Sequence, residues 1–369
     1  KKENGIYAAI NQHSWMFLSS YEKLRDKIVR QSFIDTMLHL GPRAFEEIGG
    51  EVVQSTAFVL RNYAVVDEKG IYIRLVDEKS PIEKKLKTLE AVQNPSVPYR
   101  YTFNQEDFSK IPGSPIAYWV SEELSKLFEI YKSISDYGKA CKGIDTGNND
   151  YFLKRWFEIE ISDLGINFTD FEEANKSEFK YYPYNKGGSF RKWYGNNEYV
   201  IFWDGNGNKL KSFEGSNLRN KDYYRRDGLT WSTVTSGNFS IREFSYGFYF
   251  DNGGSCLFID NKRFFMSLLN SKVFSAIQSI SPTLNFQPGD IGRVPVIFNH
   301  DEDNNIVKLS SENVELSRTD WDSFETSWDF SKHPILKFPA STIESSFNQW
   351  FDFAEKQFYQ LKENEEELN

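Results

Sequence analysis

The chain has 369 residues, 39% of them hydrophobic and 26% charged, a composition typical of a globular protein of two or three domains. No apolar run reaches the roughly 18 residues of a membrane span, and no cationic, apolar leader opens the chain, so we expect neither a membrane segment nor a secretion signal. Two distant cysteines (Cys141, Cys256) and four scattered histidines argue against a metal site or a disulfide framework and favour a reducing cytoplasm.

Charge is distributed unevenly along the chain, although its net value is -9. Residues 180–242 contain 11 Lys and Arg against 5 Asp and Glu, whereas residues 299–369 contain 6 against 16. A basic middle can bind nucleic acid even when the whole chain is acidic. The acidic end cannot hold a DNA duplex, and we expect it either to face solvent or to contact a basic partner.

The first hundred residues predict the second half of an open α/β sheet. The apolar run Gly5–Ile10 is typical of a strand buried in a parallel sheet, and a helix with an N-cap at Ser19–Ser20 follows to about Arg30. Three further strands are predicted, at Phe33–Leu40, Val52–Leu60 and Ile71–Val76. A first half of the sheet, with its own βα units, is missing from these residues.

The remaining chain predicts a connector, a mainly β region and a helical end. Residues Glu78–Pro98 are charged and partly helical, and Tyr118–Ser135 has apolar residues at helical spacing. A domain boundary is expected between Asp136 and Cys141, and short aromatic strands then alternate with Gly/Asn turns to about Ile297. Helices are predicted at Phe264–Ile280, which interrupts the strands, and at Ser341–Leu368, which is solvated.

The stretch Lys180–Trp203 interleaves cations, amides and aromatic rings around the pair Gly187–Gly188. Cations neutralise phosphates, amides can read base edges, and planar rings stack on bases. An aromatic-rich surface hairpin with ordinary solvated lysines is the alternative. Because the surrounding window is basic, the stretch favours the core of a DNA-recognition domain. No phosphate-cradling glycine motif or nucleophile elbow is present, so nothing in the stretch resembles an active site.

Several blocks of the chain resemble N6-adenine DNA methyltransferases, and most closely the PglX family of BREX phage-defence systems. The blocks lie at Asn11–Ser20 with Leu24–Arg25, Gly41–Arg61, Asp145–Asn148 with Trp156, Tyr184–Tyr199, Pro282–Gln287 and Asp320–Phe330. The resemblance covers most of the chain from Gly5 to Phe330. The S-adenosylmethionine loop and the Asn-Pro-Pro-Tyr loop of that family precede the matching segment, and neither is present in these 369 residues.

The resemblance implies a C-terminal portion of a site-specific DNA adenine methyltransferase. The implied fold is α/β followed by α+β: the end of a Rossmann-like methyltransferase sheet (1–100), a helical connector (101–140), a mainly β target-recognition domain (141–300) and an acidic, partly helical region (301–369). The full-length enzyme would use S-adenosylmethionine and no metal, whereas this chain would hold no catalytic residue and be inactive alone. The implied role of Phe45 is to stack on the flipped adenine.

The implied partners are double-stranded DNA and other defence-system proteins. Candidate phosphate anchors or guanine readers are Lys186, Arg191, Lys192, Arg219, Arg225 and Arg226. Gly187 and Gly188 would let the backbone approach a phosphate, and the other candidates are Asn185, Trp193, Tyr194 and Asn285. The alternatives for these residues are turn formation, core packing and, for Asn285, a strand docked under the preceding helix.

Two other functions remain open at this point. A Trp/Tyr platform also suits a carbohydrate-binding β-module, and the same chain could be a non-catalytic docking subunit of a defence complex.

Overall fold

A computed structural model describes residues 5–48, 53–63, 68–166, 168, 176–204, 207–235, 237–280, 285–298 and 303–369. The chain forms two compact units. Unit 1 contains Lys1–Lys132 and Ile277–Thr283, and unit 2 contains Ser133–Ala276 and Leu284–Asn369. The finer division into four functional regions stays a prediction.

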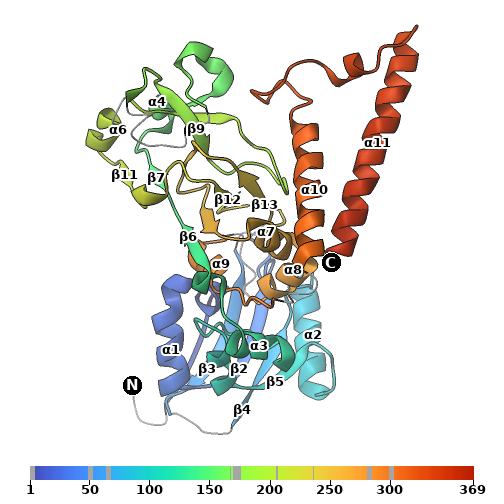
Figure 1. Ribbon diagram of the computed structural model, residues 1–369. Helices are drawn as coiled ribbons and strands as arrows, with labels where there is room; N and C mark the ends of the chain where they lie inside the picture. The colour runs from blue at the N-terminus through green and yellow to red at the C-terminus, as the bar shows by residue number, and fades with distance from the viewer. Residues whose placement is uncertain are drawn as a thin grey trace. The chain divides into compact units, whose positions relative to one another are not determined.

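Unit 1 is a mixed five-stranded sheet between helical layers (Figure 1). Its strand order is β1-β3-β2-β4-β5, and only β2 and β4 are parallel. The strands are β1 (Ile6–Gln12), β2 (Phe33–Gly41), β3 (Ser55–Arg61), β4 (Lys69–Arg74) and β5 (Arg100–Asn104), and the helices are α1 (Glu22–Gln31), α2 (Pro81–Gln93) and α3 (Glu122–Ile130).

Successive side chains of the central strands point to opposite faces of this sheet, and each face has its own hydrophobic core. Met37 and Tyr72 pack with residues of α1 and of the 101–119 segment, whereas Leu38 and Ile73 pack with Ala91 of α2. Figure 1 shows α1 and α2 on opposite sides of the sheet. The connector predicted at Glu78–Pro98 is therefore part of the covering layer rather than a free linker.

The predicted strands at Phe33–Leu40, Val52–Leu60 and Ile71–Val76 are confirmed within a few residues, with Val52 outside the described ranges. The prediction of a buried parallel strand at Gly5–Ile10 is wrong. Strand β1 lies at the sheet edge, pairs antiparallel with β3, and leaves Ile6 70% and Ile10 60% exposed. The predicted cap at Ser19–Ser20 is also wrong, because these residues form a short 3-10 turn and α1 begins at Glu22 without a side-chain cap.

Unit 2 contains three small sheets whose strands are short. Their orders are β14-β9-β10-β8, β11-β7 and β13-β12-β15-β6, and β14 and β9 are the parallel pair in them. The strands are β6 (Gly138–Cys141), β7 (Ile144–Asp145), β8 (Leu153–Arg155), β9 (Tyr181–Asn185), β10 (Tyr199–Phe202), β11 (Asn217–Leu218), β12 (Gly228–Trp231), β13 (Ile241–Phe244), β14 (Tyr249–Phe250) and β15 (Cys256–Ile259). Rings such as Tyr182, Trp203 and Phe250 fill the core, which explains the high aromatic content.

Helices frame these sheets and form the C-terminal end of the unit. They are α4 (Asn149–Phe152), α6 (Asn208–Ser212), α7 (Lys262–Asn270), α8 (Lys272–Gln278), α9 (Pro288–Gly292), α10 (Asp303–Trp321) and α11 (Ile343–Glu367). The single helix predicted at Phe264–Ile280 is two helices, because α7 ends at Asn270 and the extended backbone of Ser271 separates it from α8. The helix predicted at Ser341–Leu368 is confirmed as α11.

Helices α10 and α11 run beside each other (Figure 1), and Asn364 donates a 2.9 Å hydrogen bond to Asn313. None of the helices in the described ranges combines the length and the apolar character that a bilayer crossing requires. The described residues also hold no cluster of three or more His, Cys, Asp or Glu side chains suited to a metal ion.

Candidate nucleic-acid interface

The basic loop, defined here as residues 186–197, joins β9 to β10 and contains most of the candidate DNA contacts. Gly188 has a φ of +133°, and a Cβ atom on it would lie 2.8 Å from Nδ2 of Asn196. That amide donates to the carbonyl of Ser189 at 2.8 Å. Glycine is therefore required at position 188. Residues 188–190 lie exposed at the tip of the loop.

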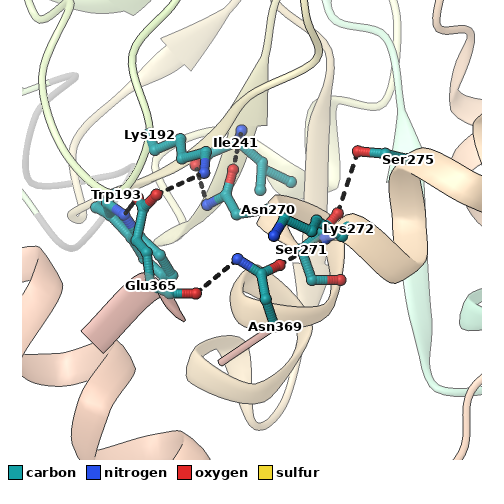
Figure 2. A network of polar contacts seen from close by, with 9 residues as sticks. All are labelled: Lys192, Trp193, Ile241, Asn270, Ser271, Lys272, Ser275, Glu365 and Asn369. Atoms are coloured by element: carbon teal, nitrogen blue, oxygen red, sulfur yellow. Dashed lines mark hydrogen bonds and ion pairs between the residues drawn. The ribbon is translucent and has the colours of Figure 1, made fainter. Parts of the chain in front are cut away.

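Lys192 and Trp193 bind the end of α11 (Figure 2). The Lys192 ammonium lies 2.8 Å from one carboxylate oxygen of Glu365, and the Trp193 indole N–H donates to the other at 2.7 Å. Asn369 donates to the Glu365 carbonyl at 2.6 Å and accepts from the Lys272 amide at 2.7 Å. The C-terminal end of the chain is thus fastened to both the basic loop and α8.

Arg191 and Tyr194 contact α10 in a similar way. The Arg191 guanidinium lies 3.2 Å from a carboxylate oxygen of Asp320 and 5.0 Å from the centre of the Trp321 ring. The guanidinium of Arg318 lies 4.7 Å from the centre of the Tyr194 ring, and burial raises the pKa of the Tyr194 hydroxyl. Two carboxylates of the acidic end, Asp320 and Glu365, therefore contact this basic loop of the same chain, whereas others such as Glu363 and Glu366 are exposed. Arg191 and Lys192 already have carboxylate partners in this structure.

Three candidate side chains lie too deep for a surface ligand to reach: Asn185, Trp193 and Arg225. Arg225 is 1% exposed, and its guanidinium lies 5.1 Å from the ring of Tyr182, 5.4 Å from Phe168 and 5.8 Å from Tyr249. Such stacking on aromatic faces stabilises a buried cation. Trp193 therefore packs in the protein core, as the alternative to a DNA contact predicted. Arg225 is also a core residue rather than an exposed phosphate anchor.

The remaining cations of the candidate set are more accessible. Lys186 lies 3.8 Å from Asp251, Arg219 pairs with Asp145 at 2.9 Å, and exposed Arg226 stacks over Tyr223. Asn285 forms an antiparallel β-bridge with Val234, and the alternative of a strand docked under the preceding helix stays a prediction. These positions belong to different loops of unit 2.

Phe45 belongs to unit 1 and lies in the loop that follows β2. Its ring is 43% exposed. The loop leaves β2 at Gly41, whose φ of +64° places the backbone in the left-handed region. The following residues Gly49–Val52 lie outside the described ranges.

Two residues of this region were not singled out by sequence reasoning. Phe190 is 54% exposed at the tip of the basic loop, and it also lines a groove of about 1190 Å³ together with Phe324 of the α10–α11 connection and Phe353 of α11. Arg242 of β13 is 1% exposed and donates to the carbonyl of Gly187 at 2.8 Å. Nothing in the pattern of a short β-strand indicates that its arginine is buried under a loop.

No protein-family model matches the chain. It is 41% identical over 386 residues to adenine-specific methyltransferase PglX of Lacticaseibacillus casei (strain Zhang), and 39% identical over 377 residues to adenine-specific methyltransferase BrxX of Escherichia coli O9:H4 (strain HS). Over its whole length, the chain is related to the PglX and BrxX adenine-specific methyltransferases. The alignments cover 100% of this chain but only 32% of PglX and 29% of BrxX, so the chain spans about a third of these relatives.

Solved structures show a broader likeness. The restriction-modification enzyme LlaBIII bound to DNA aligns with 86% of this chain and 25% of its own, at 13% identity and a TM-score of 0.48. The enzyme MmeI in complex with DNA aligns with 97% of this chain and 50% of its own, at 11% identity and a TM-score of 0.49.

Proposed function

We propose that this chain is the C-terminal portion of an adenine-specific DNA methyltransferase of a BREX-type defence system, and that it supplies target recognition. The observation that carries the proposal is the similarity to PglX and BrxX along every part of the chain. The complete enzyme would take its methyl group from S-adenosylmethionine. The sequence here contains no binding motif for that cofactor, so no step through it is assigned to these residues.

Unit 1 is proposed to complete the methyltransferase sheet. Strand β1 leaves one edge of the sheet open and exposes Ile6, Tyr7 and Ile10 on it. Open edges with apolar side chains are normally covered in folded proteins. Further strands of the longer enzyme would cover this one.

Phe45 is proposed to stack on the target adenine after the base has left the duplex. Methylation of adenine N6 requires base flipping, which costs a few kcal/mol, and stacking on a ring returns about 1–3 kcal/mol. The exposure of the Phe45 ring in a loop beside β2 and β3 supports this role.

Unit 2 is proposed to hold the duplex through its accessible cations, Lys186, Arg219 and Arg226. Contacts with phosphates fix the position of a protein on DNA without reading its sequence. The cations Arg191 and Lys192 are proposed instead to fasten the C-terminal helices, because carboxylates already neutralise them.

The test uses the longer methyltransferase that contains this chain. For Phe45→Ala we expect methylation of adenine to slow by roughly 5- to 150-fold, as the loss of about 1–3 kcal/mol of stacking predicts, while affinity for the duplex changes little. Phe351→Ala, which removes an exposed ring of α11, is the control and should leave the rate unchanged. The proposal fails if the wild-type enzyme methylates no adenine in duplex DNA. The role of Phe45 fails if its variant methylates at the wild-type rate.

A further inference from the structure

Arg242 carries a buried positive charge that no acidic side chain balances. Its Nη2 atom donates to the carbonyl of Gly187, and its Nη1 atom has no hydrogen-bond partner within the described part of the chain. No carboxylate forms an ion pair with it among those residues. By contrast, the equally buried Arg25 donates to the carbonyls of Trp15, Leu18 and Gly113.

A buried charge without a partner is strongly unfavourable, so the guanidinium of Arg242 under the basic loop destabilises the fold unless another group compensates its charge. Burial lowers the pKa of Arg242 to about 10; the charge of the Cys256 thiol acts against this shift, and the positive charge of Arg191 acts with it. No Asp or Glu side chain is among the groups that shift this pKa.

The hydrogen bond from Arg242 acts on the peptide that begins the loop tip. A trans peptide directs its C=O and N–H to opposite sides, so the carbonyl of Gly187 faces the buried guanidinium while the N–H of Gly188 points away from it. Polarisation of the carbonyl by a cation also makes the N–H of the same peptide a stronger donor.

Three successive backbone N–H groups are open at this tip. Gly188, Ser189 and Phe190 are exposed, and within the described ranges none of their N–H groups donates to another protein atom. The next N–H, of Arg191, donates to the hydroxyl of Ser240 at 3.2 Å, so the run of free donors ends there. Backbone N–H groups that follow one another in a bent loop form concave sites for anions.

We propose that the loop tip Gly188–Phe190 is a binding site for one phosphate of the DNA backbone, with Arg242 as the positioning residue that polarises it from beneath. This inference rests on the proposed function and adds a backbone contact with the duplex to those proposed for Lys186, Arg219 and Arg226. The absence of a side chain at Gly188 lets a phosphate oxygen approach its N–H closely. Lys186, at the start of the loop, adds positive charge beside the site, and its pairing with Asp251 is loose at 3.8 Å.

The first test changes the charge at the exposed tip without touching Arg242. In the 369-residue chain, Ser189→Asp places a carboxylate beside the free N–H groups, whereas Ser331→Asp makes the same change at an exposed position of the C-terminal region. We expect Ser189→Asp to weaken binding of duplex DNA roughly fivefold or more, about the loss of one charge-assisted hydrogen bond. The slope of log affinity against log salt should fall by about 0.9, the change expected for one phosphate contact. Ser331→Asp should bind as the wild type does.

The second test measures the site without DNA. Inorganic phosphate, compared with chloride at equal ionic strength, should raise the melting temperature of the wild type and of Lys332→Met, a matched removal of an exposed charge. It should not raise that of Arg242→Met. If Arg242 merely supported the fold, Arg242→Met would lower the melting temperature and keep the response to phosphate, and the inference would be overturned.

The outcomes separate this inference from the proposed function. If the wild type binds the duplex but Ser189→Asp binds it with the same affinity and salt slope, the phosphate site is refuted and the recognition role stands. If the wild type binds no duplex yet responds to phosphate through Arg242, the recognition role is refuted and the anion site stands.

Discussion

The pair His13 and His39 should make the stability of unit 1 depend on pH. Nδ1 of His13 lies 2.9 Å from Nε2 of His39, and both rings are buried among Phe17, Tyr118 and Trp119. Burial lowers the pKa of His13 from 6.5 to about 4. Burial lowers the pKa of His39 as well, and the positive charges of His13, Arg74 and Lys84 add to that effect.

The direction of the pH dependence follows from the number of protons that the folded and unfolded chains bind. Between about pH 6.5 and pH 4 the unfolded chain binds protons on these histidines that the folded chain does not, so the free energy of unfolding falls as the pH falls. The shift of His13 alone corresponds to about 3 kcal/mol, at 1.36 kcal/mol per pKa unit. The contribution of His39 has the same sign.

Native-state hydrogen exchange of the amides in β2 and β3, corrected for intrinsic rates, measures this change in unit 1 alone. Carboxylates also titrate over the interval, so the quantity of interest is the difference between variants. The double variant His13→Asn/His39→Gln, whose amides place polar atoms near those of the imidazoles, should lose at least about 3 kcal/mol less free energy of unfolding than the wild type between pH 7 and pH 4. His333→Gln changes an exposed histidine of unit 2 and serves as the control. Equal losses in the wild type and the double variant would refute the reasoning.

Two further predictions compare chemically identical substitutions. Gly41→Ala should destabilise unit 1 by about 2–4 kcal/mol, because Gly41 has a φ of +64° and the new Cβ would lie 2.8 Å from the Cα of Val76. Gly289→Ala in α9 should instead stabilise unit 2 by about 0.5–1 kcal/mol, because the new Cβ meets no atom within 4 Å. Chemical unfolding of both variants checks this, and similar effects would contradict it. Lys84→Met should lower the free energy of unfolding of unit 1 by about 1–3 kcal/mol, because the buried ammonium donates to two backbone carbonyls at 2.6 and 2.8 Å. Lys85→Met, on the exposed side of α2, should change the midpoint of urea unfolding little. An equal shift for Lys84→Met and Lys85→Met would show that these carbonyl contacts do not matter.

Periodicity located most of the regular elements, since strands with alternating or continuous apolar residues leave a clear pattern. It identified Phe33–Leu40 and Ile71–Val76 as strands and the helix at Ser341–Leu368. It did not show that the apolar run at Gly5–Ile10 is an exposed edge strand, because apolar character alone does not say which neighbours cover a strand. The break in the helix at Ser271 was hidden for a related reason, since the apolar spacing continues across it.

The individual contacts of the basic region were harder to predict than its location. A count of charges cannot distinguish Arg225, buried among rings, from exposed Arg226 beside it in the sequence. Nor can it find Glu365 as the partner of Lys192, because 173 positions separate them. Long-range pairing of this kind depends on the tertiary fold, and local sequence contains no record of it.

In the proposed recognition role, the contacts of Glu365 also limit how the basic loop could be exchanged with the corresponding segment of PglX or BrxX. Lys192 and Trp193 belong to the basic loop, yet their partner is a carboxylate on α11 near the other end of unit 2 in the sequence. A graft of residues 186–197 onto another scaffold would leave the indole N–H of Trp193 without its acceptor. A working graft must therefore carry the last turns of α11 together with the loop, so the smallest exchangeable part is discontinuous in sequence.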